Sequence, residues 1–178
     1  KVIQRNVNEL IKKLRIHKEK HNKDYYYNIR KLGKQRKEDY LQDPIDIAAR
    51  FIYLNKTCFN GLWRVNSKGD FNVPMGRYKN PSIVQEDNLQ ACHIALQSVD
   101  IRWDEFDKIT PQEGDLVYFD PPYHPLDSAS FTKYSKQDFT QLDQIELRDF
   151  ALNLHQRGVN VMLSNSNAPF IQDIYNSP

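Results

Sequence analysis

Apolar residues recur at helical spacing in the first part of the chain. Val7, Leu10, Ile11 and Leu14 lie three or four positions apart, and basic residues occupy the other faces. This pattern predicts an amphipathic helix whose apolar stripe packs on a core. Residues 20–40 mix lysine, arginine and tyrosine and are expected to be helical with interruptions.

A further helix is predicted to begin after Asp43. The Asp43 side chain can cap the helix, and Pro44 suits its first turn because that position needs no backbone donor. The helix should bury its apolar residues, which are Ile47, Ala48, Phe51, Ile52 and Leu54.

Between Thr57 and Pro81, glycine and proline interrupt short segments that favour β-structure. Residues 62–65 and 70–73 are two such segments, and the intervening residues 66–69, Asn-Ser-Lys-Gly, have the composition of a turn. The sequence therefore predicts a β-hairpin at about residues 57–81.

The remainder of the chain alternates between helical and strand patterns. A helix is expected across residues 89–99 and a short strand at residues 99–103. Residues 116–119, Leu-Val-Tyr-Phe, form an apolar run typical of a buried parallel strand.

A second helix and strand follow that apolar run. Ser135 and Asp138 form a capping box that predicts a helix running to Gly158, and residues 159–163 supply another strand. Strand, helix and strand at this spacing make a βαβ unit with a right-handed crossover. The predicted fold class is therefore α/β.

The composition excludes several classes of protein. Of the 178 residues 39% are hydrophobic, and no apolar run approaches the ~20 residues of a transmembrane helix. Two cysteines are too few for a disulfide scaffold or a four-thiolate zinc site. His17 and His21 lie four residues apart without a third ligand, so both are expected on the solvated surface. We expect no metal, no membrane and a cytoplasmic protein.

Charge is distributed unevenly along the chain. Residues 1–40 hold 13 Lys and Arg against 5 Asp and Glu, whereas the other 138 residues hold 12 against 18. A basic half suggests a polyanionic partner, and a lysine-rich helix that is simply solvated is an equal alternative.

The most informative residues directly follow the strand predicted at residues 116–119. They are Asp120, Pro121, Pro122 and Tyr123. Ligands of open α/β sheets bind at the carboxyl ends of strands. The prolines lack backbone N–H groups, so their carbonyls remain as acceptors beside a carboxylate and an aromatic ring.

Acceptors beside a flat ring suit a planar amine. The exocyclic amine of adenine is a poor nucleophile because its lone pair is delocalised into the ring. Two acceptors on its N–H groups favour a more tetrahedral nitrogen and stabilise the positive charge that develops during attack. The alternative is a strand-ending turn with an incidental aromatic residue.

The same four residues resemble the catalytic motif of amino-group DNA methyltransferases. Residues 55–66, Asn-Lys-Thr-Cys-Phe-Asn-Gly-Leu-Trp-Arg-Val-Asn, closely resemble the recognition hairpin of Dam-type (D12 class) adenine-N6 DNA methyltransferases. The similarity continues in further segments, which are residues 69–74, 76–81, 125–126, 131–134 and 163–165.

This resemblance implies the organisation of the chain. Residues 1–84 would be a helical target-recognition domain that carries the β-hairpin. Residues 85–178 would be part of a Rossmann-like methyltransferase core. The implied reaction transfers a methyl group from S-adenosylmethionine to adenine N6 in double-stranded DNA, after the adenine is flipped out of the helix.

The resemblance also assigns roles to individual residues. Asp120 and the carbonyl of Pro121 would accept from the amine, Pro122 completes the catalytic motif, and Tyr123 would stack on the flipped base. In the hairpin, Phe59 would wedge into the duplex. The remaining DNA contacts implied are Asn60, Leu62, Arg64, Lys68, Pro74, Arg77 and Tyr78.

The hairpin residues point to a particular recognition sequence. Arg64 suits base reading on physical grounds that do not depend on the resemblance. An arginine that donates two hydrogen bonds to guanine is the commonest specific contact in the major groove. The resemblance to the readers of GATC makes that sequence the expected site. Lysines of the first half would bind phosphates without reading sequence.

The chain departs from the family in its cofactor site. Its six glycines form no Gly-x-Gly, so the family's cofactor-binding loop is absent, and only Asp120 and Phe106 are expected to border S-adenosylmethionine. The sequence resembles a fragment that lacks this N-terminal loop and the C-terminal strands and is inactive alone.

Two alternatives to the DNA methyltransferase remain. One is a non-catalytic DNA-binding module, and the other is an amino-group methyltransferase acting on RNA or a protein amide. The hairpin argues against the latter. A nucleoid-associated location would follow from DNA binding, and a role in restriction–modification, phage biology or mismatch repair stays open.

Overall fold

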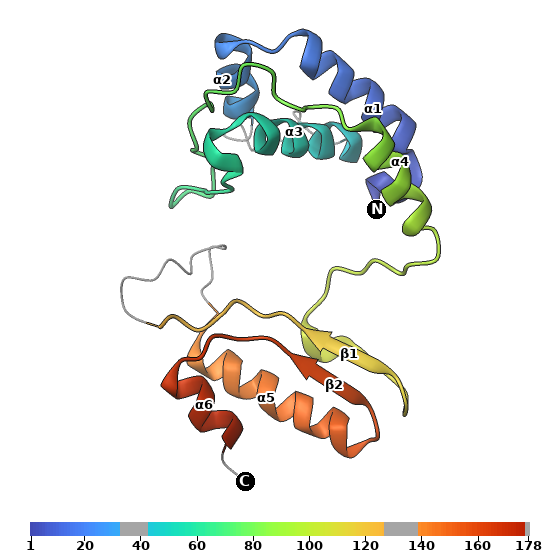
Figure 1. The fold of residues 1–178 in the computed structure, drawn as a ribbon, viewed down its shortest axis with the longest axis vertical. Coiled ribbons are helices and arrows are strands. Elements are labelled where there is room, and N and C mark those ends of the chain that lie inside the picture. Colours follow the sequence, from blue (N-terminus) through green and yellow to red (C-terminus); the bar gives the residue numbers. More distant parts are fainter. Residues whose placement is uncertain (33–42, 127–138, 177–178) are drawn as a thin grey trace. The chain divides into compact units, whose positions relative to one another are not determined.

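The structure is a computed structural model and describes residues 1–32, 43–126 and 139–176. It divides into two compact units, Lys1–Ile101 and Arg102–Pro178 (Figure 1). The capping box at Ser135 and Asp138 and the similar segment at residues 131–134 lie outside the described residues.

Helices dominate the described part of the first unit. These are α1 (Val2–Glu19), α2 (Lys23–Lys31), α3 (Pro44–Thr57) and α4 (Glu86–Ala95). Helix α1 packs against both α3 and α4, and α2 packs against α3 (Figure 1). Helix α4 thus belongs to the first unit, whereas the sequence boundary at residues 84/85 groups it with the second.

The predicted stripe of α1 is buried. Val7, Leu10, Ile11 and Leu14 form its core-facing side, which confirms the prediction from spacing. The predicted cap of α3 is also present, since the Asp43 carboxylate accepts a hydrogen bond from the Ile45 N–H at 2.8 Å.

The buried face of α3 differs in part from the predicted face. Ala49, Tyr53 and Leu54 are fully buried, whereas Ile47 and Phe51 are each 48% exposed. The spacing of aliphatic residues does not reveal that the Tyr53 ring faces the core. Leu54 was predicted correctly, and the prediction for Ile47 and Phe51 was wrong.

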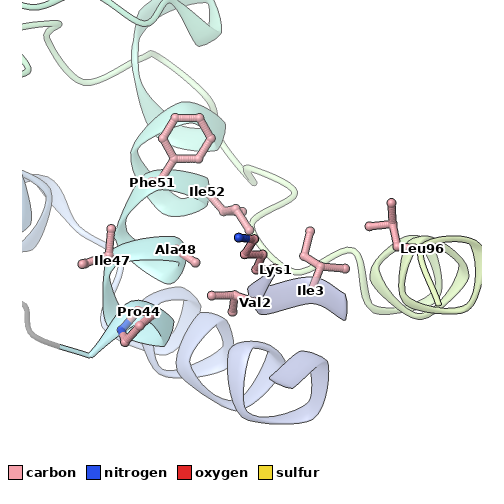
Figure 2. Close-up of a pocket in the computed structure, with 9 residues that line it drawn as sticks. All are labelled: Lys1, Val2, Ile3, Pro44, Ile47, Ala48, Phe51, Ile52 and Leu96. Carbon is pink, nitrogen blue, oxygen red and sulfur yellow. The ribbon is translucent and has the colours of Figure 1, made fainter. Parts of the chain in front are cut away.

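The exposed side of α3 borders an apolar hollow of about 600 Å³ (Figure 2). Its walls come from the start of α1, from α3 and from Leu96 after α4. Lys1 is the one charged residue among those that line it, so the hollow offers little to orient a polar ligand. The lining residues are Lys1, Val2, Ile3, Pro44, Ile47, Ala48, Phe51, Ile52 and Leu96.

Two histidines, His17 in α1 and His21 just after it, lie in an aromatic cluster. The His17 ring stacks on Tyr53 at 4.8 Å, and its Nδ1 lies 2.8 Å from the Tyr25 hydroxyl. His21 Nδ1 lies 2.9 Å from the Tyr53 hydroxyl. Both histidines are half-buried, so the prediction that they lie on the solvated surface was wrong. Tyrosines from two other helices cover them.

The hairpin is held by isolated bridges rather than by continuous strands. Val65 pairs with Phe71, and Cys58 pairs with Met75, both antiparallel. The predicted turn is present, because the Gly69 N–H donates to the Asn66 carbonyl at 2.8 Å. The backbone therefore reverses where predicted, although its pairing is sparser than in a regular ribbon.

A two-stranded parallel sheet forms the centre of the second unit. Strand β1 (Leu116–Phe119) pairs with β2 (Asn160–Leu163), with Leu116 opposite Asn160 and Phe119 opposite Leu163. Helix α5 (Gln141–Gln156) connects the strands and lies against them, and α6 (Pro169–Asn176) packs on α5 (Figure 1). This mixed helix and strand architecture agrees with the predicted α/β class.

One face of this sheet is buried and the other is exposed. Phe119 and the half-buried Val117 face a core formed with α5. Leu116, Tyr118 and Met162 are 68%, 57% and 60% exposed. The prediction of a strand at residues 116–119 is confirmed, but burial on both of its faces is not seen, because the described residues cover one face.

One predicted strand is absent from the structure, and the helix that runs toward Gly158 has its cap among the described residues. Residues 99–103 form no strand. Helix α5 begins at Gln141, because a capping box formed by Thr140 and Asp143 starts it there. At its other end Gly158, with φ +80°, permits the turn into β2 as predicted.

Candidate functional site

Asp120 lies at the carboxyl end of β1 and is exposed. Its Oδ1 accepts a hydrogen bond from the Ser164 hydroxyl at 2.7 Å. Ser164 follows β2, and its N–H donates to the Phe119 carbonyl at 3.0 Å. No donor among the described residues reaches the second carboxylate oxygen of Asp120. One oxygen is thus held by Ser164, and the other has no partner in the part of the chain that the structure describes.

The two proline carbonyls after Asp120 differ in their partners. The carbonyl of Pro122 accepts a hydrogen bond from Gln144 Nε2 at 2.9 Å. Within the described ranges no donor reaches the carbonyl of Pro121. The Tyr123 ring that follows is 48% exposed. The four residues therefore present one carboxylate oxygen, one carbonyl and one aromatic face to the surroundings.

A second loop braces this one from the end of β2. The Asn165 Oδ1 atom accepts from the His124 N–H at 3.1 Å and from the Ser166 N–H at 2.9 Å. Its Nδ2 donates to Gln144 Oε1 at 2.8 Å. Residues 163–165 form one of the segments that resemble the methyltransferase family. Two of them, Ser164 and Asn165, contact the loop after β1.

The hairpin of the first unit presents its predicted DNA-contacting residues on the surface. The Trp63 ring packs against Phe51 at 4.6 Å and Phe71 at 4.7 Å. Side chains alternate along extended backbone, so Leu62 and Arg64 face away from that packing. Leu62 is 49% exposed, and Arg64 is exposed as well.

Arg64 has a partner that sequence reasoning missed. Its Nε donates to the Asn72 Oδ1 atom across the hairpin at 2.8 Å. The terminal nitrogens of the guanidinium make no hydrogen bond with the described residues, so the two-nitrogen fork is available. The signal in the sequence is weak, because Asn72 becomes a neighbour only once the hairpin closes at residues 66–69.

The base of the hairpin brings together residues from both of its arms. The Phe59 N–H donates to the Pro74 carbonyl at 2.9 Å, and the Gly76 N–H donates to the Thr57 carbonyl at 2.8 Å. Asn60 adopts a left-handed conformation with φ 52°, which asparagine tolerates better than most residues. The exposed members of this group are Phe59, Asn60, Pro74, Arg77 and Tyr78, and Lys68 is exposed at the opposite end of the hairpin.

Side chains from α2 hold the second arm of the hairpin. The buried Tyr26 hydroxyl donates to the Val73 carbonyl at 3.0 Å, and Arg30 Nη1 donates to the same oxygen at 3.1 Å. Arg30 is fixed in turn, since Arg50 Nη2 donates to its backbone carbonyl at 3.1 Å. Arg30 and Arg50 are both half-buried and hold the backbone around the hairpin.

Phe106 lies in the core of the second unit. Its ring contacts Phe119 at 6.5 Å and Phe150 at 5.9 Å between centroids. The residue as a whole is half-buried. Among the described residues, no group of three His, Cys, Asp or Glu side chains is placed to hold a metal ion. None of the described helices has the length and apolar character that crossing a bilayer requires.

Comparison with known proteins gives one consistent result. The family model of the D12 class N6 adenine-specific DNA methyltransferases matches residues 1–177. The chain is 44% identical to a type II methyltransferase, M.MjaIII, of Methanocaldococcus jannaschii, over 98% of its own length and 64% of the relative's. It is 41% identical to a type II methyltransferase, M1.LlaDCHI, of Lactococcus lactis, over 96% of the chain and 61% of the relative.

A relative with a different name is more distant. The chain is 35% identical to the DNA adenine methylase of Escherichia coli K12, over 75% of the chain and 49% of that protein. The chain thus spans less than two thirds of the length of each of these three relatives. The family match nevertheless covers nearly every residue, so the chain belongs to the D12 class of N6 adenine-specific DNA methyltransferases.

Proposed function

We propose that this chain supplies the base-reading hairpin and the amine-binding loop of an enzyme that methylates adenine N6 in double-stranded DNA, with GATC as its preferred site. The observation that carries the proposal is the loop after β1. It leaves one Asp120 oxygen and the Pro121 carbonyl without donors from the described residues, beside the exposed Tyr123 ring.

The two acceptors match the two N–H groups of adenine N6. An amine that donates to Asp120 and to Pro121 loses part of the conjugation between its lone pair and the ring. The carboxylate also stabilises the positive charge that grows on the nitrogen during attack. Tyr123 would stack on the base after it leaves the duplex, which offsets part of the cost of unstacking.

The hairpin is proposed to enter the major groove. Arg64 offers its terminal nitrogens to guanine O6 and N7, and Leu62 offers an apolar contact. Phe59, Asn60, Pro74, Arg77 and Tyr78 surround the base of the hairpin, with Phe59 as the wedge. Lys68 and exposed lysines of α1 would contact phosphates. The first unit would then serve as a target-recognition domain.

The second unit is proposed to be part of a Rossmann-like core. The exposed apolar side chains of Leu116, Tyr118 and Met162 support this, because a large apolar face is usually covered in a complete fold. We infer that further elements of the methyltransferase cover this face in an active enzyme.

The methyl donor is proposed to be S-adenosylmethionine, as the family implies. The described residues do not make up a complete site for it. The six glycines form no Gly-x-Gly, and the Phe106 ring is engaged with Phe119 and Phe150. Asp120 and Phe106 would border the donor, and the remaining contacts are assigned to residues outside this chain.

The proposal is tested with a protein that carries this chain together with the segments that its longer relatives have. Plasmid DNA from cells that express it should resist a nuclease that cleaves only unmethylated GATC. Asp120→Ala should bind DNA normally and leave the plasmid cleavable, with kcat lowered on the order of 100-fold or more. Asp149→Ala, which removes an exposed carboxylate of α5, is the matched control.

Two results would contradict the proposal. Normal methylation by Asp120→Ala would show that this carboxylate is not the acceptor. A protein that binds DNA but transfers no methyl group would favour the alternative of a non-catalytic DNA-binding module.

A further inference from the structure

A glutamine on α5 makes two hydrogen bonds with the loops that form the site. Gln144 is fully buried, although it is polar. Its Nε2 donates to the Pro122 carbonyl at 2.9 Å, and its Oε1 accepts from Asn165 Nδ2 at 2.8 Å. Buried polar side chains carry a cost unless they are paired, and here both ends of the carboxamide are paired.

The orientation of both carboxamides is fixed by backbone groups. Asn165 Oδ1 accepts from the backbone N–H groups of His124 and Ser166, which can only donate. Asn165 Nδ2 must then face Gln144, so Gln144 must present Oε1 to it. That choice leaves Gln144 Nε2 for the Pro122 carbonyl, which can only accept. If the oxygen and nitrogen of either side-chain amide exchanged places, a donor would face a donor or an acceptor would face an acceptor.

These contacts connect α5 to the loops that follow both strands. Gln144 holds the loop after β1 at Pro122, and Asn165 holds it at His124. The Ser164 hydroxyl fixes Oδ1 of Asp120 from the loop after β2. The loop is therefore anchored on each side of Pro121 and Tyr123.

We propose that Gln144 is a positioning residue for methyl transfer. Its Nε2 donates to the Pro122 carbonyl, which is therefore already paired. The neighbouring carbonyl of Pro121 remains to accept a hydrogen bond from the adenine amine. Gln144 also fixes the backbone between Asp120 and Tyr123, which sets the separation of the two acceptors. The inference rests on the proposed function and extends it to a residue that does not touch the substrate.

The test compares two glutamines of the same helix in the full-length enzyme described above. Gln144→Met keeps a similar volume and removes both hydrogen bonds. Gln141→Met makes the same change at an exposed position of α5 and is the control. For each variant we would measure kcat for target adenine, Kd for a GATC duplex, and thermal unfolding.

Gln144→Met is expected to lower kcat about 10- to 100-fold, because a small displacement of a catalytic acceptor has an effect of that order. Its Kd for DNA should stay within about twofold, since the hairpin lies in the other unit, and Gln141→Met should leave both values unchanged. The double variant Gln144→Met with Asn165→Ala should lose less kcat than the product of the single losses, because both substitutions break the same chain of hydrogen bonds.

The proposal would be overturned if kcat for Gln144→Met stayed within about twofold of the parent. It would also be overturned if kcat fell only in proportion to the unfolded fraction at the assay temperature, because the role would then be structural. Failure of the proposed function gives a different signature, in which the parent lacks activity or Asp120→Ala retains it.

Discussion

Replacing Arg64 with alanine is expected to relax the choice of base at one guanine while leaving general affinity for DNA nearly intact. Arg64 is exposed, and the one hydrogen bond that its side chain makes with the described residues runs from Nε to Asn72. The substitution should therefore change the free energy of unfolding little, as is usual for surface residues. What it removes is the fork of terminal nitrogens that can meet guanine O6 and N7.

The magnitude follows from the geometry of that fork. A bidentate arginine–guanine contact contributes ~1–3 kcal/mol of discrimination against the wrong base. This corresponds to about 5- to 150-fold in relative affinity, since 1.4 kcal/mol is a factor of ten. Asn72→Ala should have a smaller effect of the same kind, under about tenfold. This substitution keeps the terminal nitrogens of Arg64 but removes the hydrogen bond that orients its side chain. The arginine must then lose rotamer freedom when it binds DNA.

The assay is competition binding at one fixed salt concentration, with duplexes in which each base pair of GATC is changed in turn. Arg64→Ala should bind GATC less tightly and no longer distinguish one guanine from its replacements. Lys68→Ala is the control, because an exposed lysine at the turn is proposed to contact phosphate. It should weaken binding to every duplex about equally and reduce the salt dependence.

If Arg64→Ala weakens binding to every duplex by the same factor, Arg64 does not read a base. Arg64 would then be a phosphate contact like Lys68. Equal weakening by Asn72→Ala would likewise show that Asn72 contacts the DNA itself instead of orienting Arg64.

Two further predictions concern stability and the hairpin. Burial among tyrosines lowers the pKa of His17 to about 4 from its ordinary 6.5. The unfolded chain thus binds more protons between these pH values, and the free energy of unfolding should fall by about 1–2 kcal/mol from pH 6.5 to pH 4, after allowance for partial exposure. Urea titrations should show this fall, and His17→Phe should lose most of it; an unchanged pH dependence in that variant would contradict the assignment. Gly76→Ala places a Cβ 2.8 Å from the Cys58 carbonyl oxygen and 2.5 Å from the Tyr78 ring, so it should destabilise the chain by about 1–3 kcal/mol and weaken DNA binding. Ser67→Ala in the exposed turn is its control, and equal unfolding midpoints for the two variants would refute the steric argument.

Local signals in the sequence determined much of the fold. The α1 stripe, the Asp43 cap, the turn at residues 66–69 and the strand at residues 116–119 depend on near neighbours in the chain. Side-chain spacing and backbone preferences therefore specify them before any tertiary contact exists. The motif that begins at Asp120 belongs with these, because its position directly after a strand is itself a sequence feature.

Only the tertiary structure decided which side chains meet across the fold. The covering of His17 by Tyr53, the orientation of Arg64 by Asn72, and the contact of Gln144 with Pro122 join residues 36, 8 and 22 positions apart. Gln144 lies on the same helix face as the buried Leu147 and Ala151, so its burial could be expected from spacing. Its partners could not, because hydrogen bonds between loops and a helix depend on how the strands align, and helical periodicity carries no information about that alignment.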